Sequence, residues 1–216
     1  MKNVYLFDLD GTLTDSREGI TKSVRYALHK MGKMSEDGDL KQLERFIGPP
    51  LKMSFSEFYG LDDEQCMEAI KLYRERYADV GIFENKLYEG VIETLKALKQ
   101  AGKRVALATC KPEVFAVQIC DKFGISPYLD AICGTTLSGV TTTKYEVIAN
   151  ALKELDAKAE DAVMVGDRMH DIEGAKLHDM KSIGVTFGFA KEGELEEAGA
   201  DYIVEKLTEI IDLVID

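Results

Sequence analysis

Short apolar runs alternate with stretches of helical periodicity along this chain, and this alternation restricts its fold more than any other feature. The first run, residues 4–7, ends at an aspartate and is typical of a strand buried on both faces of a sheet. Strands and helices in alternation favour right-handed crossovers and a parallel sheet, so we predict an α/β fold. The later runs lie at residues 104–108, 130–133, 162–165 and 182–185, and helical stretches at 91–100, 114–123 and 145–155 precede the first three of them.

One long segment interrupts the alternation. Between residues 16 and 79 there is no strand-like run, and the apolar residues follow helical spacing only. A chain of 216 residues is long enough for one large domain with an insertion. We therefore expect an α/β core formed by residues 1–14 and 86–216, with an all-helical domain inserted at residues 15–85.

Charge and cysteine content exclude several classes of function. The chain has 39 acidic and 27 basic residues, and this balance argues against sequence-independent binding to nucleic acid or anionic lipid. Its four cysteines lack metal-ligand spacing, and the sequence shows neither a leader peptide nor an apolar run of about 18 residues. We expect a cytoplasmic protein with reduced thiols, no nucleic-acid partner and no membrane span. Residues 191–216 hold nine acidic and two basic residues, which we interpret as solvated faces of the last helices.

Polar residues stand at the ends of the predicted strands, where an open parallel sheet binds its ligands. Gathered carboxylates repel one another unless a cation joins them, and Mg²⁺ is typically held by carboxylates, water and substrate phosphate. Any one of these aspartates alone is equally well explained as a helix N-cap or a solvated loop residue, but the set predicts a magnesium site. The residues are Asp8 and Asp10 after the first strand, Thr109 after the second, Asp167 and Asp171 after the fourth, and Lys144 at the head of a helix.

These residues fall into four ordered motifs: Asp8-Leu9-Asp10-Gly11-Thr12-Leu13, then Thr109, then Lys144, then Gly166-Asp167 with Asp171. In this order they resemble the motifs of the haloacid dehalogenase superfamily. The resemblance spans the core from Asp8 to Asp171 and implies a Rossmann-like parallel sheet, with the helical insert as a cap domain. Within the superfamily, residues 46–51 and 166–172 look most like the branch of phosphoglycolate phosphatases and 5′-nucleotidases.

The resemblance implies a role for each motif. Asp8 is implied to be the nucleophile that forms an aspartyl-phosphate, and Asp10 the general acid and base. Thr109, Lys144 and Cys110 are implied to contact the phosphoryl group, although a thiol donates weakly. The implied cofactor is Mg²⁺, held by Asp8, the Asp10 backbone carbonyl and Asp167, with Asp171 in the first or second shell of ligands.

Simpler explanations stay open for several of these residues. Thr109 is also suited to capping the helix that opens at Pro112, and Lys144 to the surface. Asp171 is also favourable in the first turn of a helix. In the insert, Gly48 belongs to a loop expected to face the core, and Arg45 and Lys52 are candidate contacts for an anionic group or ordinary surface charges.

The sequence thus predicts a magnesium-dependent phosphatase that acts on a small phosphorylated metabolite through an aspartyl-phosphate. A sugar-phosphate mutase of the same superfamily is the alternative enzyme, and a non-catalytic phosphate-binding regulator is the alternative from another class. Mutases keep both aspartates but more often carry Glu-Asp than Gly-Asp at the fourth motif, so Gly166-Asp167 favours hydrolysis over the mutase. The presence of both Asp8 and Asp10 argues against the non-catalytic regulator. The identity of the phosphomonoester and the oligomeric state stay open.

Overall fold

The computed structural model describes residues 2–137 and 143–215, and the chain divides into two compact units. Residues Met1–Thr14 and Leu87–Asp216 form an α/β unit, and residues Asp15–Lys86 form a helical unit. Two linker strands, β2 (Thr14–Asp15) and β3 (Lys86–Leu87), carry the chain from one unit to the other and pair with each other.

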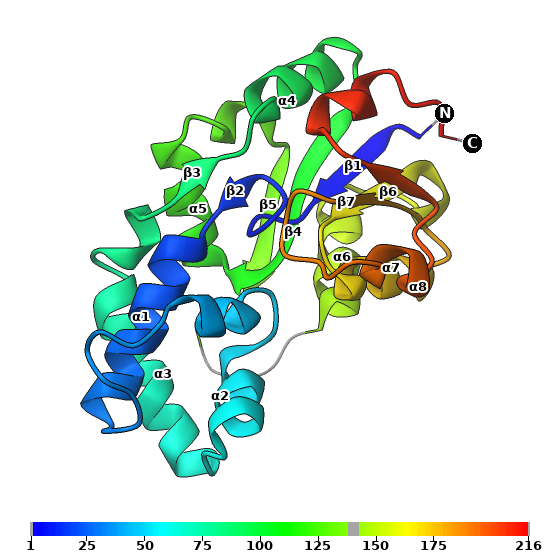
Figure 1. The fold of residues 1–216 in the computed structure, drawn as a ribbon. Coiled ribbons are helices and arrows are strands. Elements are labelled where there is room, and N and C mark those ends of the chain that lie inside the picture. Colours follow the sequence, from blue (N-terminus) through cyan, green and yellow to red (C-terminus); the bar gives the residue numbers. More distant parts are fainter. Residues whose placement is uncertain (1, 138–142, 216) are drawn as a thin grey trace. The chain divides into compact units, whose positions relative to one another are not determined.

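The α/β unit is built on a six-stranded sheet in the order β5-β4-β1-β6-β7-β8, with every neighbouring pair parallel (Figure 1). In the middle, β1 pairs with β4 on one side and with β6 on the other, and all four of its residues are buried. The predicted α/β fold with a parallel sheet is confirmed. The strands are β1 (Val4–Phe7), β4 (Arg104–Pro112), β5 (Ala131–Thr135), β6 (Ala162–Gly166), β7 (Lys181–Val185) and β8 (Tyr202–Val204).

Helices cover both faces of this sheet, as Figure 1 shows. On one face lie α4 (Val91–Gln100) and α5 (Glu113–Lys122), and on the other lie α6 (Lys144–Glu154) and α7 (Met169–Lys176). The face under α6 and α7 buries alternate strand residues against the helices, with Val4, Leu6, Ala106, Met164, Val147 and Ala175 in one apolar cluster. Because the strands are parallel, the carboxyl ends of β1, β4 and β6 meet at one edge of the sheet.

β4 is longer than the sequence predicts. It continues beyond residue 108 to Pro112, and its pairing with β5 shifts register between Ala108 and Pro112. Thr109 therefore lies within the strand and not after its end. A bulge of this kind is invisible in a hydrophobic pattern because the extra residues continue the chain without a turn signal.

The interpretation of residues 191–216 as helices alone is wrong. This stretch forms one short helix, α8 (Glu194–Ala198), then the strand β8, then a 3-10 helix, η5 (Leu207–Ile211). β8 extends the sheet beside β7, with Val204 opposite Val185. A strand of three residues is too short to show alternation in the sequence, and the acidic residues around it conceal it further.

The helical unit contains three α-helices and two 3-10 helices. Its core gathers apolar residues of several helices, and Phe46 packs edge-on against Phe55 with ring centres 5.0 Å apart. Across residues 2–137 and 143–215, no helix has both the length and the apolar character needed to cross a membrane. The elements are α1 (Arg17–Lys30), η1 (Lys41–Phe46), α2 (Leu51–Tyr59), α3 (Asp63–Tyr77) and η2 (Gly81–Phe83).

Candidate active site

Three aspartates meet at the carboxyl edge of the sheet in the α/β unit. Asp8 directly follows β1, Asp167 directly follows β6, and Asp171 lies in the first turn of α7. One carboxylate oxygen from each lies within 4.8 Å of those of the other two, and all three residues are buried. Buried oxygen donors this close together form a ligand set suited to a hard divalent cation.

Glycines allow the carboxylates to approach this closely. Gly11 turns the chain after β1 with φ of +87°, and a Cβ at this position would lie 2.1 Å from Oδ2 of Asp167. At Gly166, a Cβ would lie 2.2 Å from the carboxyl carbon of Asp171. Both positions therefore exclude any side chain if the aspartates are to keep their places.

Asp167 is fixed by groups from two other segments. The backbone N–H of Phe189 donates to its Oδ2 at 2.7 Å, and the hydroxyl of Thr12 donates to its Oδ1 at 3.3 Å. Gly188, next to Phe189, also leaves no room for a Cβ, which would lie 2.3 Å from Cβ of Asp167. The segment after β7 thus holds the aspartate that follows β6.

Lys144 is buried at the first position of α6, which rules out the surface alternative. Thr143 caps this helix and forms a capping box with Glu146, so the start of the helix is well defined. The Lys144 Nζ lies 2.9 Å from Oδ1 of Asp8 and 2.7 Å from Oδ1 of Asp171, and it donates to the carbonyl of Ala108 at 2.9 Å. Burial alone would lower the pKa of Lys144, but the two carboxylates outweigh it and raise that pKa, so the side chain is an ammonium.

The charges of this cluster do not balance. When all three are ionised, the carboxylates of Asp8, Asp167 and Asp171 exceed the single ammonium of Lys144 by two negative charges. Burial raises the pKa of Asp167 well above its ordinary value, and the charges of Asp171 and Asp8 raise it further. Burial likewise raises the pKa of Asp171, while Lys144 opposes that rise. An ion of charge +2 would balance the cluster, so both the donor atoms and the charge fit Mg²⁺.

Asp10 lies apart from this cluster, with a partner that the sequence analysis missed. Nζ of Lys111 lies 2.6 Å from Oδ2 of Asp10, and both side chains are largely buried, with exposures of 5% and 13%. Oδ1 of Asp10 is buried and has no hydrogen-bond partner among residues 2–137 and 143–215. The sequence contained one clue to Lys111: it stands two residues after Thr109, and so on the same face of an extended strand.

Thr109 and Cys110 lie within the C-terminal half of β4. The Thr109 hydroxyl accepts the backbone N–H of Lys111 at 3.3 Å, and the N-cap of α5 is Pro112, so the alternative of Thr109 as a helix cap is wrong. Burial raises the pKa of the Cys110 thiol to about 11, which keeps it protonated at neutral pH. Both residues lie on the strand next to β1, which ends at Asp8.

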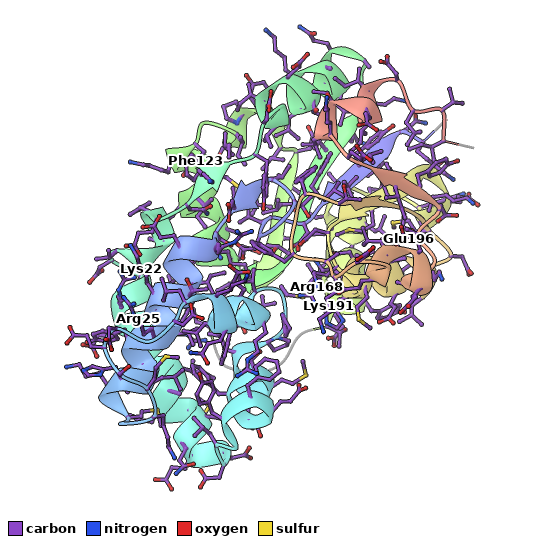
Figure 2. The ribbon with its side chains drawn as sticks, viewed as in Figure 1. Lys22, Arg25, Phe123, Arg168, Lys191 and Glu196 are labelled. Atoms are coloured by element: carbon purple, nitrogen blue, oxygen red, sulfur yellow. The ribbon has the colours of Figure 1, made fainter. Side chains whose placement is uncertain are left out.

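Arg168 is a second residue that the sequence analysis left without a role. Its Nε donates to Oε1 of Glu194 at 2.7 Å, and the same carboxylate accepts the N–H groups of Met169 and Lys191. Figure 2 labels Arg168 and Lys191 near each other, consistent with their shared partner. These bonds join the start of α7, which carries Asp171, to the first residue of α8.

The three candidate residues of the insert have partners within the helical unit. The Arg45 guanidinium lies 4.3 Å from the ring centre of Phe58, and the Lys52 ammonium lies 3.0 Å from the Asp63 carboxylate. Gly48 has φ of +100°, a conformation that favours glycine in the turn before Pro49 and Pro50. These contacts are consistent with the explanation of Arg45 and Lys52 as surface charges that stabilise their own unit.

Comparison with known proteins agrees with this geometry. The family model described as "Haloacid dehalogenase-like hydrolase" matches residues 5–185. A 5′-nucleotidase of Pseudomonas aeruginosa is 46% identical over 190 residues, which are 88% of this chain and 85% of that protein. A phosphoglycolate phosphatase of Colwellia psychrerythraea is 28% identical over 97% of this chain and 96% of that protein.

A solved structure is also closely similar. The crystal structure of a predicted phosphatase from Clostridium acetobutylicum has a TM-score of 0.93 and 48% sequence identity, and the match covers 98% of this chain and 97% of that one. Together these matches confirm the resemblance to the superfamily, and to its branch of phosphoglycolate phosphatases and 5′-nucleotidases, that the motifs indicated.

Proposed function

Because the chain belongs to the haloacid dehalogenase-like hydrolases and is a phosphoric monoester hydrolase, we propose that it cleaves a small phosphomonoester with Mg²⁺ through an aspartyl-phosphate. The proposed substrates are nucleoside 5′-monophosphates or phosphoglycolate, after the names of the similar proteins. The observation that carries the proposal is the buried cluster of Asp8, Asp167, Asp171 and Lys144.

The metal requirement is supported by the donor set and its charge. Asp8, Asp167 and the backbone carbonyl of Asp10 would hold the ion, with Asp171 beside them. All three carboxylates of the cluster are buried, and their two excess negative charges equal the charge of Mg²⁺. When bound, the ion would neutralise charge on the phosphoryl oxygens of the substrate.

In the first half of the proposed reaction, a carboxylate oxygen of Asp8 attacks the phosphorus atom of the ester. The bond between phosphorus and the ester oxygen breaks, and its electron pair stays on that oxygen, which takes a proton from the carboxyl group of Asp10. The alcohol leaves, and Asp8 carries the phosphoryl group. Lys144, whose Nζ lies 2.9 Å from Oδ1 of Asp8, supplies a fixed positive charge beside the group that is transferred.

In the second half, water attacks the same phosphorus atom. Its proton passes to the Asp10 carboxylate, the bond between phosphorus and Asp8 breaks, and inorganic phosphate leaves with Asp8 restored as a carboxylate. Asp10 thereby regains the proton that it gave to the alcohol. Thr109, buried within the neighbouring strand β4, is the proposed hydroxyl donor to the phosphoryl oxygens.

The test is phosphate release by wild type and Asp8→Asn. The variant keeps the shape of Asp8 but removes the nucleophile, so kcat on 4-nitrophenyl phosphate should fall by about 10³-fold or more. Asp156→Asn is the matched control, because Asp156 is exposed and its φ of 45° suits asparagine equally well. Activity of Asp8→Asn within about tenfold of wild type would exclude the aspartyl-phosphate route.

The substrate class is tested by a phosphate-release screen over nucleoside 5′-monophosphates, phosphoglycolate, sugar phosphates and pyrophosphate. We expect nucleotides or phosphoglycolate to be hydrolysed with the highest kcat/KM. The same screen addresses the mutase alternative with β-glucose 1-phosphate. Formation of glucose 6-phosphate without free phosphate would contradict the proposed hydrolysis.

A further inference from the structure

We propose that Lys111 is a positioning residue for Asp10, which holds Oδ2 of the Asp10 carboxyl group and leaves Oδ1 to serve the leaving group. The proposal rests on the proposed function, in which Asp10 is the general acid of an aspartyl-phosphate mechanism. It gives a role to a buried lysine that no motif of the sequence had singled out.

The contact itself is close and shielded from water. Nζ of Lys111 donates to Oδ2 of Asp10 at 2.6 Å, and the two side chains are only 5% and 13% exposed. A charged hydrogen bond of this length in a shielded place holds both groups far more firmly than a surface ion pair does. Lys111 therefore restricts rotation of the Asp10 carboxyl group about its last bond.

The backbone of Lys111 is fixed by the extension of β4. The strand runs to Pro112 after its register shift, and α5 begins at the next residue, Glu113. Within this stretch the Lys111 N–H donates to the hydroxyl of Thr109. Thr109 and Lys111 are both buried, at 2% and 8% exposure, as expected for alternate residues that share one face of a strand. The lysine thus acts from a rigid element and not from a mobile loop.

The contact makes the two oxygens of Asp10 unequal. Oδ2 accepts from the ammonium, whereas Oδ1 is buried and has no hydrogen-bond partner in the described part of the chain. A carboxyl group held by one oxygen presents its other oxygen in a fixed direction. Lys111 therefore leaves Oδ1 as the oxygen of Asp10 that is free to serve the substrate.

Lys111 and Lys144 contact different aspartates. Lys144 contacts Asp8 and Asp171 from the first turn of α6, and Lys111 contacts Asp10 from β4. The loss of Lys111 should therefore impair proton donation to the leaving group. Attack by Asp8 should be unaffected, because Lys144 still contacts Asp8. This difference can be measured with substrates that differ in their need for a proton.

The experiment compares Lys111→Met with wild type on 4-nitrophenyl phosphate, phenyl phosphate and AMP. These esters need a proton on the leaving group increasingly in that order, since 4-nitrophenolate is a stable anion and an alkoxide is not. We measure kcat/KM, which reports the steps up to formation of the aspartyl-phosphate. We expect a loss of about 10²-fold on phenyl phosphate and AMP, but less than about threefold on 4-nitrophenyl phosphate.

Two further variants keep the test decisive. Lys111→Arg retains a charged donor and should stay within about tenfold of wild type on phenyl phosphate, whether or not Lys111→Met folds well. Asp10→Asn should show the same dependence on the leaving group as Lys111→Met, and adding Lys111→Met to it should cause no further loss. Thermal melts of all variants identify any loss that is due to unfolding.

Three outcomes would overturn the proposal. An equal loss on all three esters would make Lys111 a structural residue, and a loss confined to AMP, which carries a nucleoside that the aryl esters lack, would make it a substrate-binding residue. The third outcome applies if Lys111→Met folds poorly. It is a Lys111→Arg variant that folds but is as impaired as Asp10→Asn. Failure of the proposed function looks different, because Asp8→Asn would then stay active.

Discussion

Replacement of Lys144 by methionine tests the charge arrangement of the site most directly. Methionine keeps an unbranched apolar side chain but removes the ammonium, which lies 2.9 Å from Oδ1 of Asp8 and 2.7 Å from Oδ1 of Asp171. The variant leaves three buried carboxylates without the lysine that faces them, so the excess negative charge of the cluster rises from two to three. The folded state of the metal-free protein should therefore be destabilised.

The size of the effect follows from the burial of the pair. Loss of one partner from a buried ion pair costs about 3–5 kcal/mol of unfolding free energy, because the remaining charge is uncompensated. For a chain of this length, 1 kcal/mol shifts the melting temperature by about 2–4 °C, so we expect Lys144→Met to melt about 10 °C below wild type in EDTA. Mg²⁺ should raise the melting temperature of the variant more than that of wild type, since it binds a more negative cluster.

Acidification should reduce the difference between the two proteins. Burial raises the folded-state pKa of Asp167 and of Asp171 above the ordinary aspartate value. Such a group stabilises the fold below its ordinary pKa and loses that contribution as the pH rises through its folded-state pKa. Lys144 opposes the rise at Asp171, so its loss raises the pKa of Asp171 further, and the difference in melting temperature should shrink as the pH falls from about 7 towards about 4.

Calorimetry in EDTA and in Mg²⁺ measures all three effects. Lys153→Met is the control, because Lys153 is exposed near the end of the same helix and its loss should leave the melting temperature unchanged. The reasoning is refuted if metal-free Lys144→Met melts within about 2 °C of wild type at neutral pH. It is equally refuted if the difference grows on acidification.

Three further predictions concern the metal, a glycine and the thiol. EDTA should abolish phosphate release and Mg²⁺ should restore it, so turnover that survives chelation would contradict the metal site. Gly11→Ala should lower kcat/KM by about 10²-fold, because its Cβ would lie 2.1 Å from Oδ2 of Asp167. Gly124→Ala, the control, has φ of +68° and meets nothing within 4 Å, so equal losses of activity would exclude the clash as the cause. Since burial raises the pKa of Cys110 to about 11, its alkylation by iodoacetamide, followed by mass spectrometry, should be slow at neutral pH and accelerate only at higher pH.

The sequence predicts the centre of the fold better than its edges, for physical reasons. β1 was predicted with its observed bounds, because a strand covered on both faces must be apolar throughout. β8 was missed, since an edge strand of three residues buries little and needs no such run. The start of α6 was predicted to within a residue, and Thr143 caps it by the local bonds that its sequence allows.

The candidate site divides in the same way. Asp8, Asp167 and Asp171 could be assembled from the sequence because they follow parallel strands whose ends must meet at one edge. The contact of Lys111 with Asp10 could not be predicted, because it depends on the register shift that carries β4 on to Pro112. The contact between Arg168 and Glu194 could not be predicted either, because Glu194 lies 26 residues away along the chain, in a segment whose strand was not predicted.

Lys144 and Lys111 contact carboxylates that have different roles in the proposed reaction. A nucleophile and metal ligands must stay ionised, whereas a general acid must carry a proton during the same step. Lys144 joins Asp8 to Asp171 in a cluster with two excess negative charges, and that excess favours a divalent ion. Lys111 contacts Asp10 apart from this cluster and fixes the orientation of its carboxyl group. The separation follows from the strand order, because β4 beside β1 carries Lys111 to Asp10, while Lys144 comes from α6 on the connection that crosses from β5 to β6.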